Sequence, residues 1–341
     1  MTDTRSSKRA RCTADTSGGE QNMGYKQSDA FWLRDGNIIL VAEKVAFRVH
    51  QSVLERKSEV FRDMLGLPQP ENADSESLEE CALVHVSDAA EDIRHLLSVL
   101  YDGDRVLGRK SPISMKVVFA LLQLAIKYEI DYLRDEAISI LQTLYPLSYD
   151  EFVEQRQPKS ALRITDRTEN QDPIIIINLA WKHGLHSLLP GAFFACAKLS
   201  NKELIRATKG SGREDDLTRL SDEDLERCLN GRAMLQSQYF NRYSSYEQGE
   251  CSFRCLQKHI CGSSLDNHWH TQVLFNMKNI LNFDFDPFDE IDWTCVPLCH
   301  QCRVFFEERD YLERSTIYGC LAETFRLSEV VQGSSDAETA D

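Results

Sequence analysis

The chain has 341 residues, 42% of them hydrophobic, and a formal net charge of -15. This length is enough to bury a substantial core in two domains, and the acidic charge disfavours nonspecific contact with nucleic acid phosphates. The longest uncharged apolar stretch, residues 184–197, is shorter than the roughly 20 residues that a membrane-spanning helix needs. We therefore expect neither a nucleic acid nor a membrane among the partners.

The first 27 residues are rich in Ser, Thr, Gly and charged residues and show no hydrophobic periodicity, which predicts a disordered tail. Residues 1–21 also lack the apolar segment of a secretory signal peptide. We therefore expect an intracellular protein, in the nucleus or the cytoplasm. Its eleven cysteines are then expected to be reduced thiols, some of them available for metal binding.

Residues 28–66 predict a strand hairpin followed by a helical corner. The apolar patch Ala30–Leu33 precedes two β-prone runs, Ile38–Val41 and Ala46–Val49, which can pair as a hairpin. Two short helices follow, and Ser58 is placed to cap the second of them. The apolar residues of the second helix recur on one face: Val60, Phe61, Met64 and Leu65.

The next 80 residues predict one more strand and three helices. Residues 71–80 are acidic and read as a flexible surface insert, and residues 83–86 return to the sheet. The first helix is expected to begin at Asp88 as its cap, with Glu91 as a capping-box partner, and to end at 101–103. The helices are expected at 88–101, 114–128 and 131–144. A small sheet with a helical cluster predicts an α+β domain over residues 28–147.

The spacing of residues in this region resembles the BTB/POZ domain. The first half of the resemblance rests on Asp35, the strand at 38–41, Phe47, His50, Val53, Leu54, Ser58, Phe61 and Met64. The second half rests on Leu121, Leu124, Ala125, Tyr128, Ile130 and Leu133. Together they span roughly residues 29–145, and the arrangement is also similar to BTB proteins that are numerous in mushroom-forming fungi.

The resemblance implies a protein–protein interaction module that self-associates or docks a partner. In the BTB family the segment before the first strand commonly contributes to a dimer interface, which implies that role for Phe31, Trp32 and Leu33, although burial within one chain would explain the same residues. The helical corner, with His50, Phe61 and Met64, is then expected to contact partner proteins.

Two narrower functions remain as alternatives. The family includes substrate adaptors of cullin-type ubiquitin ligases, which often carry an apolar-x-Glu contact after the Phe-Met helix, and here Leu78-x-Glu80 fits that pattern. A transcriptional regulator is the other alternative, although no zinc-finger array or basic DNA-reading helix is evident. No nucleophile elbow, phosphate-binding loop, dinucleotide fingerprint or zinc-protease motif occurs, so we do not expect an enzyme.

Residues 148–328 predict an all-helical region, and residues 329–341 an acidic disordered tail. Capping boxes begin helices at Ser148 and Ser200, and a similar cap stands at Ser221. A proline at the first helical position and Gly184 at the end bound another helix from Asp172. A further helix is expected from Asp266 to Leu281.

Two closely spaced thiol pairs stand out in this region: Cys251-x-x-x-Cys255 and Cys299-x-x-Cys302. Two pairs from separate segments can supply the four sulfur ligands of tetrahedral zinc. Cys251 and Cys255 would share a helix face, and the second pair would lie where a helix begins near Arg303. The site would be structural, because four thiolates leave no open position for water. Alternatively, these cysteines are free core thiols, since cysteine is among the most buried residue types.

Overall fold

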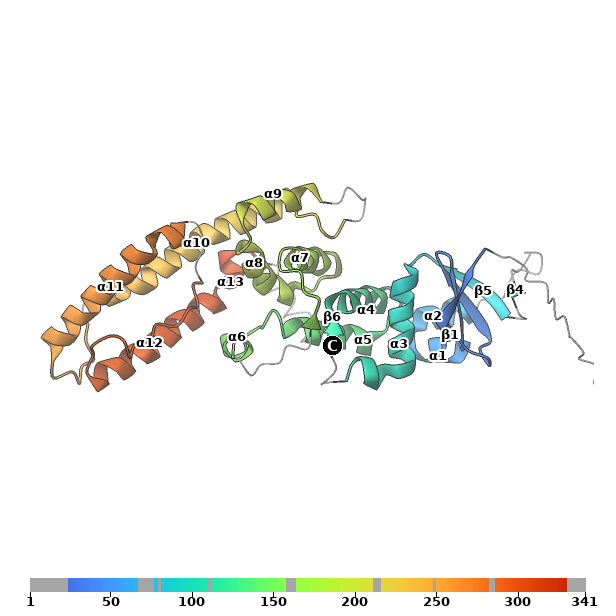
Figure 1. The fold of residues 1–341 in the computed structure, drawn as a ribbon, viewed down its shortest axis with the longest axis horizontal. Helices are drawn as coiled ribbons and strands as arrows, with labels where there is room; N and C mark the ends of the chain where they lie inside the picture. The colour runs from blue at the N-terminus through green and yellow to red at the C-terminus, as the bar shows by residue number, and fades with distance from the viewer. Residues whose placement is uncertain are drawn as a thin grey trace, which may run out of the picture. The chain divides into compact units, whose positions relative to one another are not determined.

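The computed structural model describes residues 24–66, 77–78, 81–108, 112–157, 164–210, 216–247, 250–281 and 286–329. The chain divides into two compact units, residues 1–100 and residues 101–341 (Figure 1). Most of the two predicted tails lies outside the described residues. Lys26 and Gln27, which were expected to belong to the first tail, are instead part of a strand.

The N-terminal unit is built on a five-stranded mixed sheet. Its strands are β1 (Lys26–Trp32), β2 (Ile38–Ala42), β3 (Val45–Val49), β4 (Ser77–Leu78) and β5 (Cys81–Val86), in the order β1-β3-β2-β5-β4. The predicted hairpin is confirmed, because β2 and β3 are antiparallel neighbours. β1 pairs in parallel with β3, and β5 pairs in parallel with β2.

Two parts of this sheet differ from the sequence-based expectation. The patch around Phe31 is itself part of strand β1 and does not merely precede the first strand. Within the acidic insert, Ser77 and Leu78 form a short strand paired with β5. Strand β1 depends on β3, which is distant in the sequence, and local periodicity does not encode that pairing. Strand β4 pairs with the strand that directly follows it, as Leu78 lies opposite Cys81. Residues 67–76 and 79–80 of the insert lie outside the described residues.

The helical corner after β3 forms as predicted. It consists of α1 (Gln51–Lys57) and α2 (Glu59–Gly66), and the backbone N–H of Phe61 donates to Ser58 Oγ at 3.0 Å. This bond satisfies one of the donors that the first turn of a helix leaves unpaired. Leu54 from α1 and Phe61 from α2 are fully buried. The capping serine therefore stabilises the corner between two short helices whose apolar residues pack into the core.

The next helical segment, α3 (Ala90–Val106), begins two residues after Asp88. Glu91 in its first turn forms an ion pair with Arg94. The segment consists of two helices joined by a kink, with non-helical dihedral angles at Asp102 (φ -123°, ψ 30°). The first helix therefore ends within the predicted range 101–103, and the second, which continues to Val106, was not predicted.

The second unit is mainly helical, as predicted. Its α-helices are α4 (Met115–Lys127), α5 (Asp131–Gln142), α6 (Tyr149–Gln155), α7 (Asp172–His183), α8 (Leu189–Ala197), α9 (Asn201–Lys209), α10 (Asp222–Glu247), α11 (Lys258–Leu281), α12 (His300–Gly319) and α13 (Leu321–Thr324). A 3-10 turn, η1 (His186–Leu188), precedes α8. The described chain adds one unpredicted feature, a parallel pair of two-residue strands, β6 (Ile113–Ser114) and β7 (Ile164–Thr165).

Local signals set several of the helix boundaries in this unit. Complete capping boxes begin α6 at Ser148 and α9 at Ser200. Gly184 ends α7 with a φ of 68°, a conformation that glycine adopts without strain. Asp172 is the first residue of α7 and not its cap, and its carboxylate accepts a hydrogen bond from the backbone N–H of Thr168 at 2.7 Å.

The last long helices, α10, α11 and α12, form an arm in which α10 and α11 run antiparallel, side by side (Figure 1). The starts of α11 and α12 lie together at one end of this arm. The side chain of Arg232 holds α10 against the end of α8, because its Nε donates to the carbonyl of Ala197 at 2.6 Å and its guanidinium also donates to the carbonyl of Leu199. Among the described residues, no helix is both long and apolar enough to cross a membrane.

Candidate interaction surface and cysteine cluster

One face of the N-terminal sheet carries a partly exposed apolar surface. Its buried layer consists of Ile39, Val41, Ala46 and Cys81. Four larger side chains, Tyr25, Trp32, Leu78 and Leu83, pack on this layer and stay partly exposed. We call these four residues the sheet-face surface. Aromatic and large aliphatic side chains in this half-buried state are typical of protein-binding surfaces.

The six residues expected to mediate interaction occupy different environments. Phe31 and Phe61 are buried inside the chain, so neither is exposed for contact with a partner in this conformation. Trp32, Leu33, His50 and Met64 are half-buried. His50 lies against Asp35, with 3.3 Å between Nε2 and Oδ1, and this contact contributes, after a backbone hydrogen bond, to lowering the pKa of Asp35. The structure brings Trp32, but none of the other five, into the sheet-face surface.

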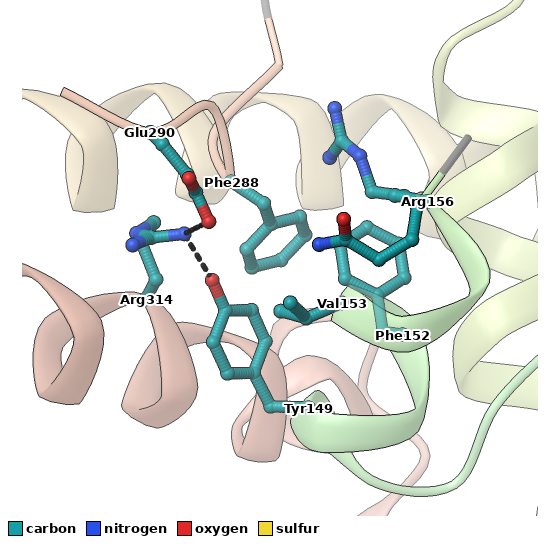
Figure 2. A pocket seen from close by; sticks show the side chains of 8 residues that line it. Tyr149, Phe152, Val153, Arg156, Phe288, Glu290 and Arg314 are labelled. Carbon is teal, nitrogen blue, oxygen red and sulfur yellow. Dashed lines mark hydrogen bonds and ion pairs between the residues drawn. The ribbon is translucent and has the colours of Figure 1, made fainter. Parts of the chain in front are cut away.

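In the helical unit, a pocket of about 200 Å³ opens beside α6. Figure 2 shows its aromatic wall, formed by Tyr149, Phe152 and Phe288, with Arg314 and Glu290 at one side. Arg314 Nη1 donates to Tyr149 Oη at 2.6 Å and to Glu290 Oε1 at 3.2 Å. On the other side, Arg156 forms ion pairs with Asp286 and Asp289, both at 3.2 Å.

Both arginines of the pocket thus already have carboxylate partners. A cationic pocket that selects an anionic ligand needs charge left available for that ligand. The arrangement therefore fits internal packing of α6 against the 286–290 segment better than anion binding.

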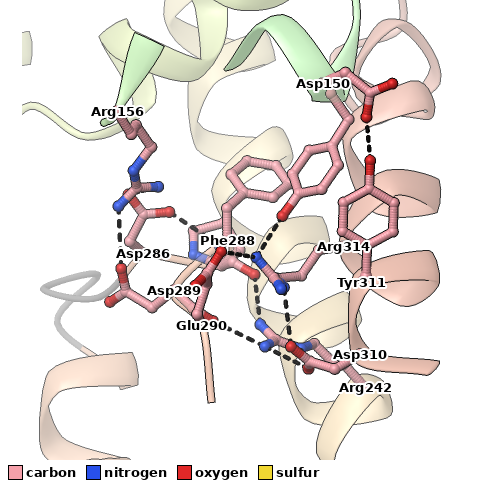
Figure 3. Close-up of polar contacts among 12 residues, drawn as sticks. Asp150, Arg156, Arg242, Asp286, Phe288, Asp289, Glu290, Asp310, Tyr311 and Arg314 are labelled. Carbon is pink, nitrogen blue, oxygen red and sulfur yellow. Dashed lines mark hydrogen bonds and ion pairs between the residues drawn. The ribbon is translucent and has the colours of Figure 1, made fainter. Parts of the chain in front are cut away.

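The pocket residue Arg314 also belongs to a buried charged network (Figure 3). Arg242 of α10 is fully buried and pairs with the buried Asp310 of α12, with Nη2 2.6 Å from Oδ1. The same guanidinium donates to the carbonyls of Pro287 and Asp289 at 2.9 and 2.8 Å. Asp310 also accepts from Arg314 Nε at 3.0 Å. Sequence analysis missed this network, since Arg242 and Asp310 are 68 positions apart and neither stands in a recognisable motif.

Four cysteines converge at the starts of α11 and α12. The Sγ atoms of Cys255, Cys261, Cys299 and Cys302 all lie within 4.8 Å of one another. Cys255 and Cys299 are 3.7 Å apart. Three of the four side chains are buried, and Cys299 is half-buried. Around them pack the apolar side chains of Leu265, Trp293, Val296, Leu298 and Phe306.

Three of the four predicted metal ligands belong to this group, and Cys261 takes the place of Cys251. The prediction assumed that Cys251 and Cys255 share a helix face, but the structure places both before α11, which begins only at Lys258. Cys251 Sγ donates to the carbonyl of Lys258 at 3.4 Å and also interacts with the thiols of Cys255 and Cys302 at the edge of the group. Because α11 begins eight residues before the predicted start at Asp266, Cys261 falls in its first turn and faces Cys299. Had α11 been predicted to begin at Lys258, Cys261 could have been identified from the sequence as a member of this group.

Backbone groups surround these sulfurs. The N–H of Gln257 donates to Cys255 Sγ and the N–H of Cys299 donates to Cys261 Sγ, each at 3.4 Å. A hydrogen bond from the backbone of Cys302 is the main cause that lowers the pKa of the Cys299 thiol, to about 7. Burial raises the pKa of Cys302, which a hydrogen bond from the backbone of Ser252 partly offsets. The cluster therefore combines converging thiols with backbone donors.

Comparison with known proteins identifies a known domain family in the N-terminal part of the chain. A search of curated proteins found no match. The family model of the BTB/POZ domain matches residues 33–144. This range includes strands β2 and β3, the helical corner, α3, α4 and nearly all of the region on which the sequence resemblance rested. The small sheet and the helices of this range confirm the predicted fold. Residues 33–144 of this chain are therefore a BTB/POZ domain, a protein–protein interaction module.

Proposed function

We propose that this protein self-associates through the sheet-face surface of its BTB/POZ domain. The observation that carries the proposal is the partial exposure of Tyr25, Trp32, Leu78 and Leu83 over a fully apolar layer. A second copy of the chain presents the same surface, so that a two-fold interface would bury both sets of side chains against each other.

The position of these residues in the sheet supports this proposal. Tyr25 and Trp32 flank or end β1, which forms one edge of the sheet, and Leu78 belongs to β4 at the other edge. The surface therefore extends across the whole width of the sheet. Tyr25 also lies 5.7 Å from the ring of His85 on β5. Aromatic residues held in this way present a large contact area at little cost in side-chain entropy.

The proposal can be tested by measuring the molar mass of the full-length protein. Light scattering after size-exclusion chromatography is expected to give twice the 39.1 kDa of one chain. Trp32→Glu places a charge in the apolar interface and should shift the protein to monomer at the same concentration. Tyr132→Glu, at an exposed position of α5, is the matched control and should remain dimeric. A wild-type protein that is monomeric at all concentrations, or a dimer that tolerates Trp32→Glu, would contradict the proposal.

A cullin adaptor is the second candidate function, because Leu78 of the Leu78-x-Glu80 pattern lies on the sheet as part of a strand. Binding to the N-terminal domain of a cullin would then involve α2, where Met64 is half-buried. Met64→Glu is expected to abolish capture of the cullin domain. The variant should nevertheless have the same molar mass in solution as the wild-type protein. No capture by the wild-type protein would exclude this candidate without affecting self-association.

A further inference from the structure

The cysteine cluster at the starts of α11 and α12 has a geometry that needs an explanation independent of the BTB/POZ domain. We propose that Cys255, Cys261, Cys299 and Cys302 bind one Zn²⁺ ion, which acts as a structural joint between α11 and α12. Self-association plays no part in this proposal, since all four residues belong to the helical unit.

The distances between the sulfurs fit a tetrahedral ion. With Zn–S bonds of about 2.3 Å, the sulfurs of a tetrahedral site lie about 3.8 Å apart. The measured separation of Cys255 and Cys299 is 3.7 Å, and no pair exceeds 4.8 Å. The group can therefore close around an ion with shifts of about one ångström. Four sulfur ligands favour zinc over hard cations such as Mg²⁺ or Ca²⁺, which prefer oxygen.

The pattern of burial in this segment argues against the alternative that these cysteines are buried only as small hydrophobic side chains. In the segment that carries Cys255 and Cys261, three larger apolar residues point to solvent: Phe253, Leu256 and Ile260 are 82%, 98% and 57% exposed. Hydrophobic burial alone would favour the larger side chains over cysteine, because transfer free energy increases with apolar area. This segment instead buries its cysteines, as expected where sulfur coordination determines its conformation.

The surroundings also suit thiolates. Each of the four sulfurs is approached by a backbone N–H group, from Gln257, Cys299, Cys302 and Ser252. Cys261 lies in the first turn of α11, Cys299 caps α12, and Cys302 lies in its first turn. The positive end of a helix dipole stabilises negative charge at such positions. Four thiolates leave no open coordination site for water, so the ion would be structural and not catalytic.

The ion would strengthen the end of the arm where three helices meet. The apolar residues around the cluster come from α10, α11, α12 and the described part of the segment that precedes α12. Zinc would tie the first pair of cysteines to the second across the 37 residues between Cys261 and Cys299. Because the four thiols assemble only in the folded chain, the binding free energy of the metal adds directly to folding stability.

The test is elemental analysis of the purified full-length protein, produced with zinc in the growth medium. We expect one zinc per chain in the wild type and loss of that zinc in Cys261→Ser and Cys302→Ser. Cys295→Ser is the matched control and should retain full zinc, since Cys295 is exposed and bonds to Asp292. Retention in Cys261→Ser with loss in Cys251→Ser would overturn the ligand set, and a wild type without zinc would overturn the site.

Two further measurements on the wild type keep the proposal testable if the serine variants do not fold. X-ray absorption at the zinc edge should show four sulfur neighbours at about 2.3 Å, and any nitrogen or oxygen in that shell would contradict an all-cysteine site. Thiol titration of the metal-stripped, denatured protein without reductant should give all eleven cysteines. A deficit of two thiols that maps to this cluster would show a disulfide in place of the ion.

Discussion

The two units of this molecule bury different chemistry in their interiors. Among the described residues of the N-terminal unit, the buried polar side chains are those of Ser28 and Ser58. The described part of the helical unit buries six charged side chains: Asp172, Asp224, Arg232, Arg242, Asp310 and Arg314. The described core of the first unit is thus almost entirely apolar, whereas that of the second combines apolar side chains with buried charges that need specific partners.

This difference has an energetic consequence. A buried ion pair contributes little beyond what an apolar pair of the same shape would contribute, but removal of one partner leaves a charge without compensation. An apolar core loses stability in proportion to the volume removed. The unfolding free energy of the helical unit should therefore decrease strongly when one buried charged side chain is replaced, even where the intact ion pair contributes little.

The largest effect is expected for Arg242→Ala. This change leaves the buried carboxylate of Asp310 without its closest cation, and it also removes the donors to the carbonyls of Pro287 and Asp289. We expect a loss of about 3–5 kcal/mol from the unfolding free energy of the helical unit. Urea unfolding followed by tryptophan fluorescence measures it. In a Trp32→Phe background the signal comes only from Trp181, Trp269 and Trp293, all in that unit.

The control for this prediction is an exposed ion pair in the same unit. Asp131 and Arg134 are 3.0 Å apart at the start of α5, where Asp131 is exposed and Arg134 partly exposed. Asp131→Asn should cost less than about 1 kcal/mol, since solvent screens surface pairs. If Arg242→Ala costs no more than Asp131→Asn, the distinction between the two interiors fails.

The same contrast explains how much of the structure could be predicted from sequence. The β2–β3 hairpin, the Ser58 cap and the capping boxes of α6 and α9 were predicted correctly, because each depends on residues within a few positions. The BTB/POZ domain was recognisable because its apolar residues keep their register along the chain. Strand β1 was missed as a strand, since its pairing with β3 is parallel and non-local.

The candidate sites show the same limit. Cys255, Cys299 and Cys302 could be selected because close spacing is visible in the sequence, but Cys261 could not, because its contribution depends on where α11 begins. The Arg242–Asp310 pair gave no signal at all, since nothing near either residue marks it as buried. Long-range polar contacts are specified by the tertiary fold, and periodicity does not encode them.

A smaller effect is expected where a capping serine is removed. In Ser200→Ala, the backbone N–H of Glu203 loses its acceptor, Ser200 Oγ, which lies at 3.3 Å. The reciprocal hydrogen bond, from the backbone N–H of residue 200 to the Glu203 carboxylate, is then the only one left of the capping box. The expected loss is about 1 kcal/mol in the same urea measurement. Ser114→Ala is the matched control, since Ser114 occupies the cap position of α4 without a side-chain capping bond. Equal losses in the two variants would show that the capping bond does not stabilise α9.

The smallest predicted effect is a pH dependence caused by His183, the last residue of α7. Burial lowers the pKa of its ring below 6.5, and the neighbouring Lys182 acts in the same direction. Its Nε2 is buried with no hydrogen-bond partner among the described residues. In the unfolded chain the ring binds a proton near pH 6.5, but in the folded chain it resists protonation, so stability falls as the pH drops through 6.5 toward the lowered value.

Because the ring is only half-buried, solvent screening limits this loss to well under about 1 kcal/mol between pH 7.5 and pH 5.5. The measurement is the urea midpoint at both pH values for the wild type and for His183→Gln, whose amide is uncharged throughout this range. The variant should show a smaller decrease on acidification than the wild type, because all other titrating groups are shared by the two proteins. Titration of the His183 ring by NMR gives an independent value, and a pKa at or above 6.5 would show that burial does not disfavour the charged ring at this position.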